Sequence, residues 1–192
     1  MTVFEYGSSI ISIILGLAVA HLLGGLTAPL RLRSSSGTHW IFTAWCISTL
    51  FVVVGGWYGI WSILQDVETL YFFRFLPLLL VCCVIYGAAR ILVPDFHSDV
   101  LPDLRAHFES IRAPFFYCLA FVFGAGAAVM PVLNITAGGT AALLEIGSGV
   151  VLCALALAGA FVANPRFQAV LALAWPAIYL VQQGIQPAIS AL

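Results

Sequence analysis

Few polar side chains interrupt the long apolar segments of this sequence, and His21 is the deepest of the ionisable ones. It lies in the uncharged stretch 7–30, fourteen residues after Gly7 and ten before Arg31. At the rise of a helix these separations are roughly 21 and 15 Å. A neutral imidazole at such a depth can relay a proton, gate a path or contact a ligand. It can equally be a structural histidine that hydrogen-bonds a carbonyl or a serine.

Arg74 and Glu145 form a second candidate pair. Each lies about four residues inside the same predicted end of its apolar segment, so both are expected at a depth of roughly 6 Å. They can form an ion pair that faces a cavity. Alternatively, each side chain extends separately to the headgroups, and Glu5 can compete for Arg74.

The last apolar segment carries a polar stripe. Trp175, Tyr179, Gln182 and Gln186 fall at positions i, i+4, i+7 and i+11, which is one face of a helix. Glutamines that face lipid are costly, so this face is expected to meet either another helix or a solute pathway.

Metal, cofactor and catalytic chemistry find little support. Asp99, Asp103 and His107 have a spacing of four, but a solvated polar face is the commoner explanation of such a set. The remaining histidines lie at or beyond a segment boundary, which argues against haem ligation by two histidines. No nucleophile–base arrangement or glycine-rich phosphate loop is present, so we expect no metal, no cofactor and no enzyme.

These residues are carried by apolar segments long enough to cross a membrane. Charged residues make up 8% of the 192 residues and hydrophobic residues 62%, whereas about 25% of a soluble domain is charged. The sequence therefore predicts an all-α membrane protein that forms a single transmembrane domain, 1–192. Six spans of about 20 residues are expected at 7–30, 40–64, 70–93, 114–133, 141–162 and 168–190.

The arginines predict an orientation. Six of the seven basic residues fall in the first, third and fifth connections, and Arg74 is the exception. The positive-inside rule places these connections in the cytoplasm and both termini outside. The third connection, 94–113, has apolar residues at helical spacing and is expected to form a short cytoplasmic interfacial helix. No basic patch suits a nucleic acid.

Small residues recur every four positions through the first span. This ridge comprises Ser8, Ser12, Gly16, Ala20, Gly24 and Ala28. Small residues at this spacing let two helix backbones approach closely. We expect the first helix to be an interior element, with the ridge packed against its own chain or, alternatively, against another subunit.

The opening FEYGSSIISIILGLAVAHLLGG resembles that of small, uncharacterised multi-pass bacterial membrane proteins, over about the first 25 residues. The resemblance implies a bacterial cytoplasmic (inner) membrane protein, and it transfers no activity, ligand or site.

Two function classes fit these observations. The first is an integral membrane subunit that assembles with itself or with another membrane complex in the lipid bilayer. The second is a small-solute permease or channel with an outward-facing polar cavity, lined by Arg74, Glu145, Tyr179, Gln182 and Gln186. Because the spans contain few carboxylates for an ion-coupled transporter, the sequence favours the assembling subunit.

Overall fold

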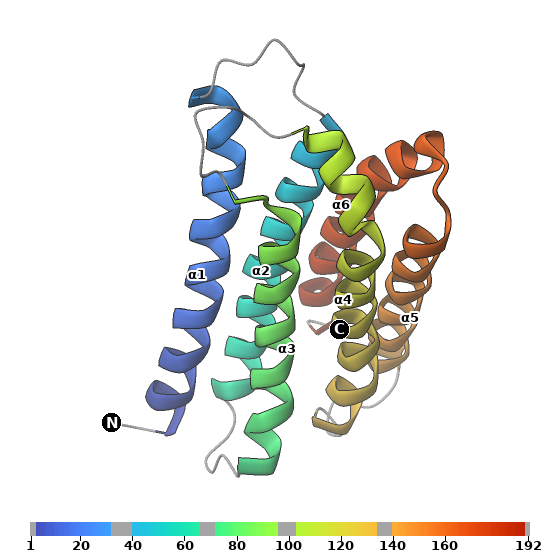
Figure 1. Cartoon of the computed structure of the whole chain (residues 1–192). Helices are drawn as coiled ribbons and strands as arrows, with labels where there is room; N and C mark the ends of the chain where they lie inside the picture. Colours follow the sequence, from blue (N-terminus) through green and yellow to red (C-terminus); the bar gives the residue numbers. More distant parts are fainter. Residues whose placement is uncertain (1–2, 32–39, 66–71, 96–102, 134–139, 191–192) are drawn as a thin grey trace.

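Backbone N–H and C=O groups have no water to bond within a bilayer, so long apolar segments satisfy them within helices. The computed structural model describes residues 3–31, 40–65, 72–95, 103–133 and 140–190. Figure 1 shows that these residues form six helices: α1 (Val3–Arg31), α2 (Trp40–Gln65), α3 (Phe72–Leu92), α4 (Leu104–Leu133), α5 (Thr140–Phe161) and α6 (Pro165–Ser190). The predicted all-helical fold is confirmed.

Four of the helices are long and apolar enough to cross a membrane. Their apolar stretches are Glu5–Ala28, Trp40–Trp61, Phe75–Leu92 and Leu104–Ala128. In the described part of α5 the apolar stretch is shorter, Ile146–Phe161. Four such helices fit a multi-pass membrane protein, and the crossing of all six helices stays a prediction.

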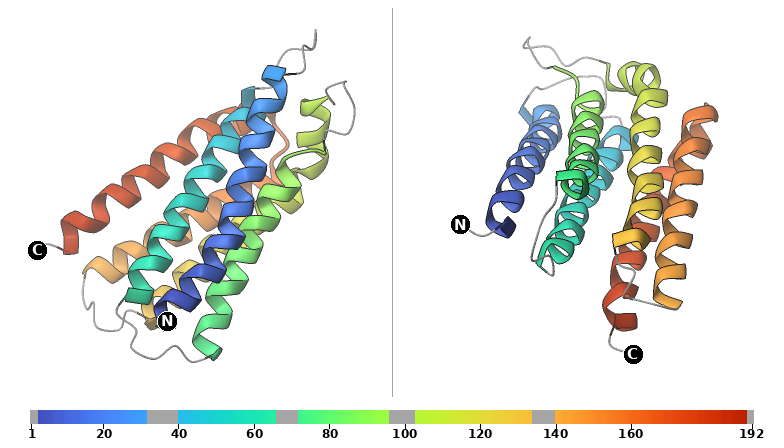
Figure 2. Two further views of the ribbon diagram at one scale, coloured as in Figure 1. Left: turned by 90° about the vertical axis from the view of Figure 1, so that its left-hand side faces the viewer. Right: turned by 90° about the horizontal axis from the view of Figure 1, so that it is seen from below.

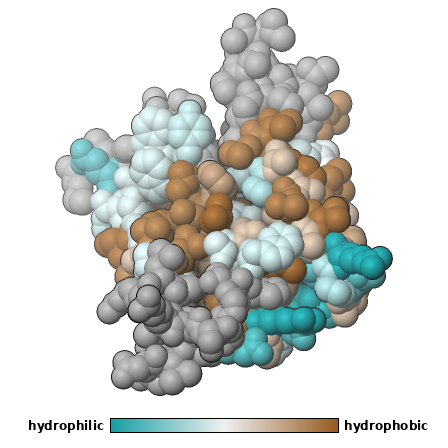
Figure 3. Space-filling view, turned by 90° about the horizontal axis from the view of Figure 1, so that it is seen from above, coloured by the Kyte–Doolittle hydropathy of each residue, from teal (hydrophilic) through white to brown (hydrophobic). Residues whose placement is uncertain are grey.

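The helices alternate in direction, so charged residues gather at one end of the bundle. The helices α1, α3 and α5 end where α2, α4 and α6 begin (Figure 1). Arg90, Arg105 and Arg166 all belong to this end. Figure 3 looks onto it and shows hydrophilic residues along one margin, beside a largely apolar middle.

The helix α2 is the central element of the bundle. It contacts α1, α3, α4 and α6, while α4 packs mainly on α5 and α3. The two views in Figure 2 agree with Figure 1 that α1 and α5 lie on opposite sides. In the core, Trp45 of α2 meets Phe115 and Phe116 of α4 and Trp175 of α6, with ring centroids 4.8–5.7 Å apart.

Within the described chain α1 is a peripheral helix, so the expected packing of its ridge against its own chain is wrong for Gly16, Ala20 and Gly24, while packing against another subunit stays a prediction. Among the described residues α1 contacts only α2 and α3. The face that it turns to them consists of Ile11, Leu15, Ala18 and Leu22, each at most 2% exposed. Burying this larger apolar face leaves Gly16, Ala20 and Gly24 of the ridge exposed.

The two ends of the ridge differ from its middle. Ala28 is buried and Ser8 is half-buried. Ser12 is exposed, and its Oγ accepts a hydrogen bond of 3.0 Å from Trp57 Nε1 of α2. A Cβ built on Gly16 or Gly24 meets no heavy atom within 4 Å. The middle of the ridge therefore does not pack against its own chain.

The separate interfacial helix is also corrected, because residues 104–113 are the first turns of α4. Pro114 lies within the helix and does not end it. Leu104 and Phe108 are two of the apolar residues that were expected to face the membrane surface, and both are buried in the core of the protein. They are apolar because they pack against neighbouring helices.

Candidate functional site

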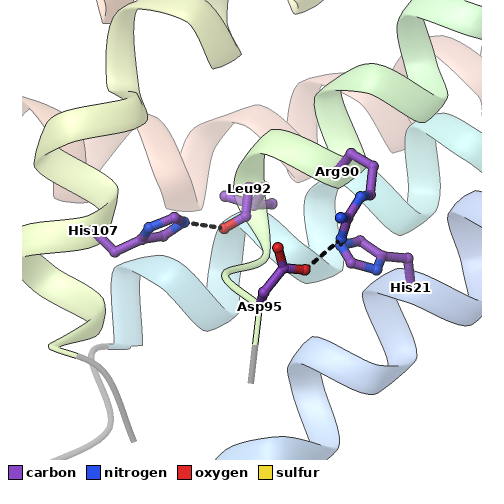
Figure 4. A network of polar contacts seen from close by, with 5 residues as sticks. All are labelled: His21, Arg90, Leu92, Asp95 and His107. Atoms are coloured by element: carbon purple, nitrogen blue, oxygen red, sulfur yellow. Dashed lines mark hydrogen bonds and ion pairs between the residues drawn. The ribbon is translucent and has the colours of Figure 1, made fainter. Parts of the chain in front are cut away.

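The best-defined polar site joins α1 to the end of α3. Arg90 lies in the last turn of α3, and Asp95 follows three residues after the helix ends. Arg90 Nη1 lies 2.8 Å from Asp95 Oδ1 and 3.3 Å from His21 Nε2. Figure 4 shows these three side chains pointing toward one another. His21 is thus next to an ion pair rather than isolated in an apolar span.

The chemistry of arginine fixes the proton on His21. A guanidinium carries only donors, so the His21 Nε2 atom that faces it must be the acceptor. In a neutral imidazole the proton is then on Nδ1. The same ring also lies next to the backbone of Val93.

A close backbone approach brings these groups together. Gly25 lies one helical turn after His21, and a Cβ at this position would come within 2.6 Å of Val93 Cγ2. The absence of a side chain at Gly25 lets the chain that leaves α3 lie directly against α1. Thus Gly25 supplies the space and His21 the polar contact.

A second histidine binds the end of α3 from the other side. His107 of α4 lies with Nε2 3.1 Å from the Leu92 carbonyl oxygen (Figure 4). A carbonyl oxygen can only accept, so this nitrogen carries a proton. The last turn of α3 is therefore held between α1 and α4.

The predicted pair of Arg74 and Glu145 lies outside what the structure describes. Both residues belong to helices, but their side-chain positions are not among the described features. The ion pair stays a prediction.

The predicted face of α6 is turned into the bundle where it is described. Trp175 is fully buried and Tyr179 is 5% exposed. Phe123 of α4 packs edge-to-face on both rings, with centroids 5.3 and 5.9 Å away. A Cβ on Gly55 of α2 would collide with the Tyr179 ring and hydroxyl. The two aromatic residues of the stripe therefore fill an interface between helices.

Three buried polar atoms near this interface have no hydrogen-bond partner in the described part of the chain. They are the indole nitrogens of Trp45 and Trp175 and the side-chain oxygen of Gln182. The Gln186 side chain is outside the described residues. An unpaired buried donor or acceptor costs about 1–3 kcal/mol, so these three atoms are polar groups that the described chain leaves unsatisfied.

The sequence analysis missed Gln168. This residue is buried, and its Nε2 donates to the carbonyls of Gly159 and Val162 at 2.9 and 2.8 Å. It therefore satisfies two carbonyls at the end of α5. The available signal was a glutamine at the start of an apolar segment, just after Asn164-Pro165.

Asp103 has a local structural role. Its Oδ1 accepts hydrogen bonds from the backbone N–H groups of Arg105 and Ala106 at 3.0 and 3.2 Å, which makes it the N-cap of α4. Within the described ranges, no group of three histidine, cysteine or acidic residues could hold a metal ion. Asp99 lies outside those ranges.

Comparison of the chain with protein families, curated proteins and solved structures found no match.

Proposed function

We propose that this protein is an integral subunit of the bacterial cytoplasmic membrane that assembles, through the outer face of α1, into a homo- or hetero-oligomer. All six helices cross the membrane, with both termini outside. The described arginines Arg90, Arg105 and Arg166 at one end of the bundle support the orientation. The N-terminal resemblance supports the bacterial membrane.

The observation that carries the proposal is the open middle of the ridge. Gly16, Ala20 and Gly24 are exposed on a helix at the edge of the bundle, and no atom of the described residues covers either glycine. In membranes, helices associate by close packing at small residues, because lipid is as apolar as the side chains. The exposed ridge offers such a surface to a second helix.

The test adds bulk to the ridge without disturbing the protomer. We expect Gly16→Leu with Gly24→Leu to abolish assembly, measured as the mass of the complex purified in nanodiscs and as crosslinking in native membranes. The melting temperature of the protomer should not fall, because both sites are open within the chain. Gly147→Leu is the matched control, since Gly147 in α5 is also exposed with nothing within 4 Å.

Two results contradict the proposal. One is a wild-type protein that is monomeric and brings down no membrane partner. The other is an assembly that survives both leucines unchanged.

Cysteine labelling tests the orientation separately. Positions 35 and 98 should react only from the cytoplasmic side and position 138 only from outside. If position 138 is labelled only from the cytoplasmic side, the proposed orientation is contradicted.

A small-solute permease or channel is the second candidate. The unpaired buried atoms of Trp45, Trp175 and Gln182 favour it, because a polar solute or water would satisfy them. In proteoliposomes, permeation of glycerol or urea should then exceed that of empty vesicles. Gln182→Leu should lower it while assembly persists. Equal permeation with and without the protein excludes this function for these solutes.

A further inference from the structure

The two histidines at the end of α3 have opposite proton requirements. His107 Nε2 donates to the Leu92 carbonyl at 3.1 Å, and a second proton on its other nitrogen leaves that bond intact. His21 Nε2 must instead remain unprotonated, because it accepts from Arg90 Nη1 at 3.3 Å. Acidification therefore breaks the contact between His21 and Arg90 and leaves the bond between His107 and Leu92 intact.

The charges around His21 do not compensate for an added proton. From α3 the neighbour is Arg90, with Tyr86 one turn before it, and the only described anion nearby is Asp95. The helix α2 has no charged residue between positions 40 and 61, and its titratable side chains there, Cys46 and Tyr58, are neutral near pH 6. The helix α1 itself has no charged residue between Glu5 and Arg31. One carboxylate would thus face two cations.

The described chain does not seal this site. The side chains of Arg90 and Asp95 are 44% and 53% exposed, and His21 is partly exposed at the same end of the bundle. Histidine is the side chain whose charge ordinarily changes between about pH 5 and 8, so it is the group here on which a change of pH can act.

We propose that His21 is a proton-operated latch that holds the chain leaving α3 against α1. When His21 is neutral it accepts from Arg90, and the ring and Gly25 keep Val93 beside α1. When His21 takes up a proton, Nε2 loses its lone pair and becomes a second cation beside the guanidinium. Arg90 and the segment 93–95 then separate from α1, while His107 keeps its bond to Leu92. This regulation is independent of the proposed assembly.

The experiment follows the Val93 amide, which donates to the Ala89 carbonyl at 3.3 Å. Hydrogen exchange of the segment 91–95 is measured on the full chain in nanodiscs at pH 8 and pH 5.5, and is corrected for the intrinsic pH dependence of exchange. In the wild type we expect protection to fall about tenfold at the lower pH, which corresponds to about 1.4 kcal/mol lost from the closed state.

Three variants separate the histidines. His21→Gln keeps an acceptor that cannot become a cation, so protection should no longer change with pH. His107→Gln should respond to pH as the wild type does. His39 and His97 are present in the wild type and in every variant, so a pH response that His21→Gln abolishes does not come from them. Arg90→Gln removes the repelled partner and should also abolish the response, which keeps the test available if His21→Gln does not fold.

The proposal is overturned if the wild-type segment is equally protected at both pH values. It is also overturned if His21→Gln or Arg90→Gln retains the wild-type response.

Discussion

Two adjacent glycines in α1 should respond very differently to the same added methyl group. Gly24 faces outward with nothing within 4 Å of a built Cβ, whereas at Gly25 the Cβ would be 2.6 and 2.8 Å from the two methyl carbons of Val93. Favourable carbon–carbon contacts lie at about 3.5–4.0 Å. The overlap at Gly25 is therefore about 1 Å with two atoms at once.

The neighbour has little freedom to move away. Val93 is 3% exposed, and a β-branched side chain has few alternative rotamers. Overpacking of this kind costs about 1–3 kcal/mol. Both substitutions replace a helical glycine by alanine, so their gain in helix propensity cancels in the comparison. We expect Gly25→Ala to be less stable than Gly24→Ala by about 1–3 kcal/mol.

Thermal unfolding of the two variants in one detergent, at one scan rate, measures this difference. For a chain of this size 1 kcal/mol shifts the midpoint by about 2–4 °C, so the two midpoints should differ by about 2–12 °C. Val93→Ala introduced with Gly25→Ala should restore part of the loss, since a double-mutant cycle reports contact between the two sites. Equal midpoints, or a double variant whose effects simply add, would refute the close approach of Val93 to α1.

Two further predictions concern helix ends. Gln168→Leu leaves the carbonyls of Gly159 and Val162 without their donor, so it should lower the free energy of unfolding by about 1–3 kcal/mol. The control is Arg166→Gln, at an exposed position nearby, which should stay within about 0.5 kcal/mol of the wild type when thermal unfolding is measured in the same detergent. Asp103→Ala removes the N-cap of α4 and should lower the free energy of unfolding by about 1 kcal/mol. Asp103→Asn keeps a capping oxygen and should retain most of the stability. If Asp103→Asn loses as much stability as Asp103→Ala, the capping role is contradicted.

The helices were predictable because apolar length and helix formation are tightly linked in a membrane. The predicted span 40–64 corresponds to α2 (Trp40–Gln65), and 141–162 to α5 (Thr140–Phe161). The boundary at Pro114 was wrong, since this proline lies inside α4. Periodicity showed that Leu104 and Phe108 lie on one face, but it did not show whether protein or lipid covers that face.

The faces of α1 could not be assigned from hydropathy. Lipid and protein interior are similarly apolar, so α1 carries large apolar residues both on its inward face, with Ile11 and Leu15, and on its outward face, with Ile13 and Leu17. The contact between His21 and Arg90 was missed for a related reason. It depends on the axial register of α1 against α3, which local spacing does not determine.

The aromatic core has a consequence for biosynthesis. Trp45 of α2 is buried by Phe115 and Phe116 of α4 and by Trp175 of α6. Because a chain is made from its N-terminus, α2 is synthesised long before the residues that cover this indole. The packing of the central helix is therefore completed only after the last helix has been made. A chain arrested before Trp175 still lacks one of the walls around Trp45, which gives a quality-control protease a feature that distinguishes incomplete molecules from finished ones.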